Sequence, residues 1–125
     1  MNIIVDTHIL IWILNEPDKL SNSAKKILLE GNPNVLVSAA TIWELSIKSA
    51  NKKITITNDW LKAINESGFR NLDITLHHAK LAGQLPHYHK DPFDRMLVAQ
   101  AICEDFYLLT HDKMLKKYEA KILLA

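Results

Sequence analysis

The chain is organised around the stretch HKDPFDRMLVAQA, which runs from His89 to Ala101. Charged residues and Pro92 lead into an apolar run with helical spacing, which predicts a helix from Pro92 to about Glu104. Asp91 and Asp94 fall in its first turn, where side-chain oxygens cap free N–H groups and the helix dipole favours negative charge. Taken alone, this motif is a well-capped helix start.

The composition is that of one globular domain. The chain has 125 residues, of which 48% are hydrophobic, and its net charge of +1 lacks the strong basic excess of many nucleic-acid-binding domains. The single cysteine, Cys103, excludes an internal disulfide, fits a reducing compartment and is expected in the core. The N-terminus does not resemble a signal peptide, and no apolar run is long enough to span a bilayer. We therefore expect one soluble, cytoplasmic domain over residues 1–125.

Short apolar runs alternate with helical patterns along the chain. We expect strands at residues 2–6, 35–38, 71–74, 106–110 and 121–124, and helices at residues 7–14, 21–29, 39–50, 76–85, 92–104 and 112–118. A further helix, capped by Asn58 or Asp59, ends at Glu66, and residues 51–57 form a polar connection with a short extended piece. Continuous apolar strands are typical of a sheet covered on both faces. The alternation predicts an α/β domain with a mainly parallel sheet.

Four acidic residues stand at comparable junctions of these elements. Asp6 closes the first strand, Asp112 follows the fourth, Glu44 lies in the helix after the second, and Asp94 lies in the first turn of the helix before the fourth. In a doubly wound sheet the functional crevice lies at the carboxyl ends of the strands. Which edge the helix of Asp94 approaches depends on the topology, and the residues alone leave that open.

Each acid also has a purely structural interpretation. Asp91 and Asp112 are natural N-caps, Asp6 is a possible cap of the first helix, and Glu44 forms an i,i+4 pair with Lys48 that is worth only ~0.2–0.5 kcal/mol on a surface. If the acids meet, however, they repel one another unless a hard divalent cation such as Mg²⁺ or Mn²⁺ binds between them. Such ions support phosphoryl chemistry. A zinc-site pattern, a glycine-rich phosphate loop and a serine nucleophile elbow are all absent from the sequence.

Four blocks of the sequence resemble the PIN-domain family, in order and at the expected spacing. They are Val5–His8 (VDTH), Trp43–Lys48 (WELSIK), Asp91–Ala101 (DPFDRMLVAQA) and Thr110–Asp112 (THD). The nearest match is to small bacterial VapC-like ribonuclease toxins of VapBC-type toxin–antitoxin pairs. The resemblance implies a PIN-like three-layer sandwich with a central, mainly parallel sheet of about five strands flanked by helices.

The resemblance also implies a site and an activity. Its metal-binding and catalytic residues would be Asp6, Glu44, Asp94 and Asp112, with Asp91 as an additional acid, and Lys48 and Arg95 as substrate-binding residues. The activity would be Mg²⁺- or Mn²⁺-dependent endoribonuclease cleavage, in which an activated water attacks the RNA phosphodiester bond. RNA would be the substrate, a cognate antitoxin the protein partner, and the protein a homodimer.

Two other functions stay open. One is a PIN-like binding module whose acids are idle. The other is a Mg²⁺-dependent phosphatase-like enzyme, although that chemistry usually needs a second aspartate two residues after the first, and this sequence has His8 there. Trp12, Trp43 and Trp60 are expected in the core, and exposed ones would serve partner contacts.

Overall fold

A computed structural model of the chain describes residues 1–53, 56 and 59–125. The strands are β1 Asn2–Val5, β2 Asn34–Ser38, β3 Arg70–Leu72, β4 Tyr107–Thr110 and β5 Lys121–Leu124. The helices are α1 Thr7–Asn15, α2 Asn22–Leu29, α3 Ala39–Ala50, α4 Trp60–Glu66, α5 Leu76–Gln84 and α6 Pro92–Glu104, with short 3-10 helices η1 Pro17–Lys19 and η2 Lys113–Lys117.

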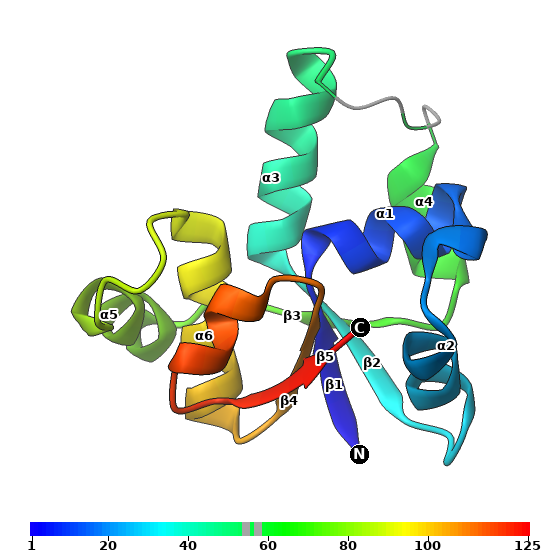
Figure 1. The fold of residues 1–125 in the computed structure, drawn as a ribbon. Helices are drawn as coiled ribbons and strands as arrows, with labels where there is room; N and C mark the ends of the chain where they lie inside the picture. Colours follow the sequence, from blue (N-terminus) through cyan, green and yellow to red (C-terminus); the bar gives the residue numbers. More distant parts are fainter. Residues whose placement is uncertain (54–55, 57–58) are drawn as a thin grey trace.

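The five strands form one parallel sheet in the order β3-β2-β1-β4-β5. The chain adds β2 and β3 on one side of β1, and then crosses over to add β4 and β5 on the other side (Figure 1). The strand order therefore reverses between β1 and β4, and ligand crevices of open α/β sheets lie at the carboxyl ends of strands at such a point. The predicted α/β class and mainly parallel sheet are confirmed.

Helices cover both faces of the sheet and make it the middle of three layers (Figure 1). Alternate residues of each strand point to opposite faces. One face packs Ile4, Leu36 and Leu108 against α5 and α6, and the other packs Ile3 and Val37 against α1, α2 and α4. Because every strand residue of this inner region meets a hydrophobic layer, the strands are apolar without interruption, as the sequence predicted.

Helix α6 runs back along the sheet to the edge where β1 and β4 end. Only Asp105, in the left-handed region with φ 58°, and Phe106 connect α6 to β4. So short a connection makes the helix antiparallel to the strand it precedes, and the N-terminus of α6 lies at the carboxyl edge of the sheet (Figure 1). The direction of the Asp94 helix, which the sequence left open, is thereby decided.

The boundaries differ from the prediction in a few places. The first strand ends at Val5, and Asp6 is the N-cap of α1; the third strand is Arg70–Leu72, shifted toward the N-terminus. Asp59 precedes α4 but makes no side-chain cap. The alternative cap, Asn58, and most of the predicted extended piece in residues 51–57 lie outside the described residues.

Two predictions of burial were wrong. Cys103 is exposed, because the apolar stretch around it turns its other side to the sheet. Trp43 is also exposed, whereas Trp12 and Trp60 are partly buried and pack against the core. Among the described residues, none of the helices combines the length and the hydropathy that crossing a bilayer requires.

Candidate functional site

Asp6 stands at the centre of the carboxyl edge and is only 3% exposed. Its Oδ1 accepts a hydrogen bond of 2.8 Å from the backbone N–H of Ile9, which caps α1. Its Oδ2 accepts a hydrogen bond from the hydroxyl of Thr110, the last residue of β4. Burial raises the pKa of Asp6 although these hydrogen bonds oppose the shift. Asp6 therefore caps α1 and belongs to the acidic site at the same time.

Asp112 is joined to Asp6 through the same threonine. The backbone N–H of Asp112 donates to Thr110 Oγ1 at 3.0 Å, and Asp112 Oδ1 caps η2 by accepting from the Met114 N–H at 2.9 Å. Partial burial alone would raise the pKa of Asp112, but the Met114 N–H and the His89 imidazole together lower it below its ordinary value. Asp112 is thus held as a carboxylate facing the strand end of β4.

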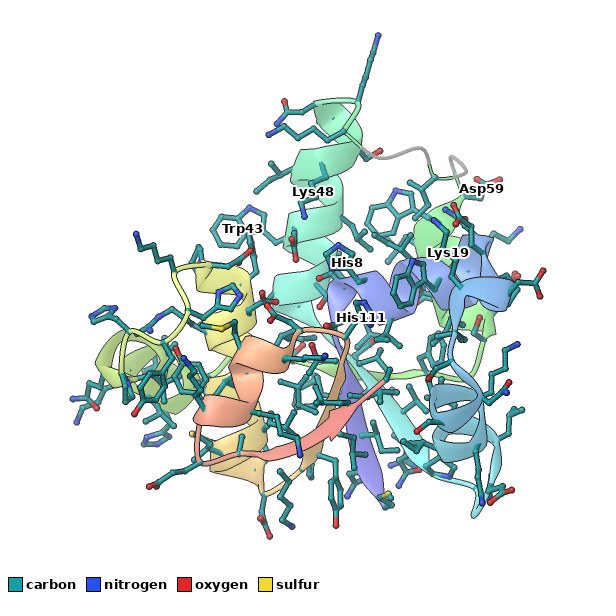
Figure 2. All side chains as sticks on the ribbon, viewed as in Figure 1. His8, Lys19, Trp43, Lys48, Asp59 and His111 are labelled. Carbon is teal, nitrogen blue, oxygen red and sulfur yellow. The ribbon has the colours of Figure 1, made fainter. Side chains whose placement is uncertain are left out.

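Glu44 comes from α3 and is 4% exposed. Its Oε1 accepts a hydrogen bond from the hydroxyl of Thr7, the residue after Asp6, and its Oε2 pairs with Lys48 Nζ at 2.6 Å. The predicted i,i+4 pair is therefore present, but its acid is buried rather than on a solvated surface. Lys48 lies on α3, above Trp43 and His8 in the view of Figure 2.

Asp94 completes the group from the N-terminus of α6. Asp91 Oδ1 accepts from the N–H groups of Phe93 (2.8 Å) and Asp94 (3.3 Å), so that Asp91 caps the helix that aims Asp94. Burial raises the pKa of Asp94 to about 7, and the negative charges of Asp91, Asp6 and Glu44 add to this effect, while His89 opposes it. Residues from four separate elements are therefore close enough to act on one carboxyl group.

His89 is a member of the site that the sequence analysis missed. Its Nε2 lies 2.7 Å from Asp112 Oδ2 and 3.4 Å from Asp94 Oδ2. Its Nδ1 accepts a hydrogen bond of 3.1 Å from the backbone N–H of Asp91. A ring nitrogen that accepts carries no proton, so the proton of the neutral ring is on Nε2, which then donates to Asp112. The only signal in the sequence is the position of this histidine two residues before the helix cap.

The comparisons with known proteins agree with this geometry. The family described as "PIN domain" matches residues 3–121 of the chain. The chain belongs to the PIN-domain family. One relative of this PIN-domain protein is "Ribonuclease VapC22" of Mycobacterium tuberculosis, which is 29% identical over 120 residues, with 93% of this chain and 91% of the relative covered.

Solved structures show the same fold. VapBC2 of Rickettsia felis, bound to a DNA fragment from its promoter, has a chain with TM-score 0.72 and 18% identity, covering 100% of this PIN domain and 98% of that chain. A toxin–antitoxin complex of Klebsiella pneumoniae gives TM-score 0.68 at 19% identity, with 96% of this chain and 94% of that chain covered. Both likenesses extend over nearly the whole chain, so the predicted PIN-like three-layer sandwich is confirmed.

The PIN-domain site has the donor set that a hard divalent cation requires. Ligand atoms of His89, Asp94 and Asp112 lie within 4.8 Å of one another, and Asp6 and Glu44 lie close enough to act on the charge of Asp94. The predicted carboxylates of Asp6, Glu44, Asp94 and Asp112 would supply oxygen ligands. Burial is the largest cause of the raised pKa of Asp94, and the neighbouring negative charges of Asp91, Asp6 and Glu44 add to it. Because Nε2 of His89 carries the ring proton, we assign this residue to orienting Asp112 rather than to ligating the ion.

The guanidinium of Arg95 is engaged by the protein itself, an arrangement that speaks against a substrate-binding role, which stays a prediction. Its guanidinium is buried and donates to the backbone carbonyls of Ala82, Leu85 and Pro86 at 2.8–2.9 Å, with longer contacts to His89 O and Tyr118 Oη. These carbonyls lie at the end of α5 and in the turn that follows. Arg95 therefore fixes that turn to α6, since one residue along a helix turns its side chain by about 100° away from that of Asp94.

Proposed function

We propose that this PIN-domain protein is an endoribonuclease that depends on Mg²⁺ or Mn²⁺. The observation that carries the proposal is the convergence of Asp6, Glu44, Asp94 and Asp112 at the carboxyl edge, next to the reversal of strand order. The relative named as a ribonuclease, similar over nearly the whole chain, supports RNA as the substrate.

The four acids have different parts in this proposal. Asp6 and Asp94 would hold the cation, while Glu44 and Asp112 complete the pocket. The hydroxyls of Thr110 and Thr7 fix the carboxylates of Asp6 and Glu44, so that little reorganisation is needed when the substrate arrives. Asp91 acts on the site through the helix cap.

The substrate phosphate carries negative charge into an acidic pocket, which is why the cation is needed. When bound, a divalent ion neutralises this charge and lowers the pKa of an attacking water. Lys48 is the basic residue we retain as a phosphate contact, because it lies beside Glu44 with about a third of its side chain exposed. His89 keeps Asp112 in a defined orientation throughout.

We further propose that the protein is the toxin of a toxin–antitoxin pair. The similar structures include the toxin–antitoxin complex of Klebsiella pneumoniae and VapBC-5 of Mycobacterium tuberculosis, a member of the VapBC family of toxin–antitoxin systems, at TM-score 0.62 and 16% identity over 98% of this chain and 96% of that chain. Such a protein would act on RNA in the cytoplasm, would be held inactive by a cognate antitoxin and would form a homodimer.

The test is cleavage of a single-stranded RNA by the purified protein. We expect cleavage with Mn²⁺ or Mg²⁺, none with EDTA, and loss of cleavage in Asp6→Asn and Asp94→Asn. Asp59→Asn is the matched control, because Asp59 is an exposed aspartate on the α4 side of the molecule, outside the acidic group (Figure 2). Equal cleavage by the wild type and by Asp6→Asn and Asp94→Asn would point to a contaminating nuclease and end the proposal.

A further inference from the structure

A large aromatic side chain is exposed beside the acidic site. Trp43 is 63% exposed, although its neighbours in α3, Ile42 and Leu45, pack in the core. Its ring lies edge-to-face against Phe93 of α6, with ring centroids 5.2 Å apart and an interplanar angle of 76°. This packing holds the indole in one orientation while it leaves a face open to solvent.

Both rings are chain neighbours of the acids. Trp43 directly precedes Glu44, and Phe93 directly precedes Asp94. Trp43 lies on the α6 side of the base of α3, whereas His8 and His111 lie on the α1 side (Figure 2). The contact between Trp43 and Phe93 joins α3 and α6 at the turns that carry Glu44 and Asp94, whose charges interact, so the aromatic pair forms a rim beside the acidic site.

We propose that Trp43, held in place by Phe93, is a stacking platform for one base of single-stranded RNA next to the bond that is cleaved. The proposal rests on the ribonuclease function proposed above and identifies the substrate class of the same site. When a phosphate of the RNA reaches the acids and their cation, the adjoining bases lie at the rim. An uncharged base binds best to an uncharged surface, which the rim provides. Every base has a π-face that stacks on an aromatic ring, and a duplex hides those faces.

The chemistry of the rim favours a base over a phosphate. Trp43 has no net charge, and the cation of the same helix, Lys48, is the phosphate contact proposed above, so the rim itself offers an uncharged surface. Stacking on indole tolerates any base. The platform would therefore make the enzyme select for unpaired RNA more strongly than for a particular base.

The experiment measures RNA binding without cleavage and without a cation, in the Asp94→Asn background, which removes one of the charges that repel the phosphate. A fluorescein-labelled single-stranded RNA of about twelve nucleotides is titrated with the parent, with added Trp43→Ala or Trp43→Phe, and with added Leu29→Ala as control. Leu29 is also an exposed apolar side chain, at the end of α2 next to the amino edge of the sheet. We expect Trp43→Ala to weaken binding about tenfold, which is about 1.4 kcal/mol, and Trp43→Phe and Leu29→Ala to change it less than about threefold.

A set of RNAs with one abasic nucleotide at successive positions separates stacking from other causes. For the parent protein, removing the base at one position of the RNA should weaken binding about as much as Trp43→Ala does. Removing the same base should not weaken binding by the Trp43→Ala variant any further, because its stacking partner is already gone. Unchanged binding by Trp43→Ala, or equal losses at every abasic position in both proteins, overturns the proposal. So does a Trp43→Ala variant that binds RNA normally but fails to bind a protein partner, since the rim is then a protein contact. If the wild type cleaves no RNA with Mn²⁺, the ribonuclease function itself has failed.

Discussion

Replacing Asp94 by Asn should stabilise the metal-free protein. The side chain keeps its shape but loses a charge that burial disfavours most and that Asp91, Asp6 and Glu44 also oppose. In the folded protein the pKa of Asp94 is about 7 instead of 3.8, and this difference corresponds to about 4 kcal/mol at ~1.36 kcal/mol for each pKa unit. Because the Asp94 side chain retains 20% of its surface exposed, water screens part of the repulsion, and we expect about 2–4 kcal/mol.

The pH dependence of this effect has a definite sign. Between pH 3.8 and about 7 the folded protein holds a proton on Asp94 that the unfolded chain has released. The free energy of unfolding of the wild type therefore falls as pH rises through this window and levels off above it. The advantage of Asp94→Asn should be largest near pH 8 and shrink to about a third at pH 5.

The measurement is urea unfolding in EDTA, followed by circular dichroism at pH 5 and pH 8. Asp59→Asn, which removes an exposed charge without a side-chain cap bond, should change stability by less than about 0.5 kcal/mol at either pH. Adding Mn²⁺ should stabilise the wild type, by ~2.7 kcal/mol at 100 times the dissociation constant, and should stabilise Asp94→Asn much less. An Asp94→Asn protein no more stable than the wild type at pH 8 would refute the account of the acidic site as a set of opposed charges.

Three further variants test individual contacts. His89→Ala should weaken Mn²⁺ binding roughly tenfold in a thermal-shift titration, because the orientation of Asp112 is lost, and His89→Gln, which keeps an N–H donor, should recover part of it; equal affinities would exclude the positioning role. Arg95→Met should lower the free energy of unfolding by at least ~3 kcal/mol, since several buried carbonyls lose their donor, and Arg95→Lys should fail to rescue it; a stable variant that has only lost RNA affinity would restore the substrate-binding role. Asp91→Asn should keep the helix cap and unfold within ~0.5 kcal/mol of wild type, whereas Asp91→Ala should lose ~1 kcal/mol, both measured by urea unfolding; equal losses would mean that the cap is not what Asp91 contributes.

Much of the fold follows from local features of the sequence. Strands β1, β2 and β4 are short apolar runs, and their burial on both faces is what a parallel sheet between helix layers requires. The sequence also predicted that the acids lie near strand ends and helix starts. The direction of α6 was left open by the sequence analysis, and the two-residue connection between α6 and β4 decides it, because it leaves room only for an antiparallel return.

The sequence did not predict the side-chain contacts between separate helices and loops, because these depend on tertiary packing. Trp43 was expected in the core because apolar residues surround it, and only the place of α6 shows that the helix side bearing Trp43 faces solvent and Phe93. The substrate-binding role of Arg95 was implied by the family resemblance, and its engagement by the carbonyls of Ala82, Leu85 and Pro86 depends on packing between α5 and α6. His89 escaped notice because its partner Asp112 is 23 residues away and meets it only through tertiary packing.

The cap and the site are coupled by charge as well as by geometry. Asp91 holds the first turn of α6 through the N–H groups of Phe93 and Asp94, and this places the Asp94 carboxyl group. The same Asp91 carboxylate raises the pKa of Asp94, after burial the largest single contribution. An Asn cap would preserve the first effect and remove the second. A cation that binds at Asp94 is therefore attracted by Asp91 even without a bond to it, and Asp91→Asn should weaken Mn²⁺ binding in a protein whose helix start is intact.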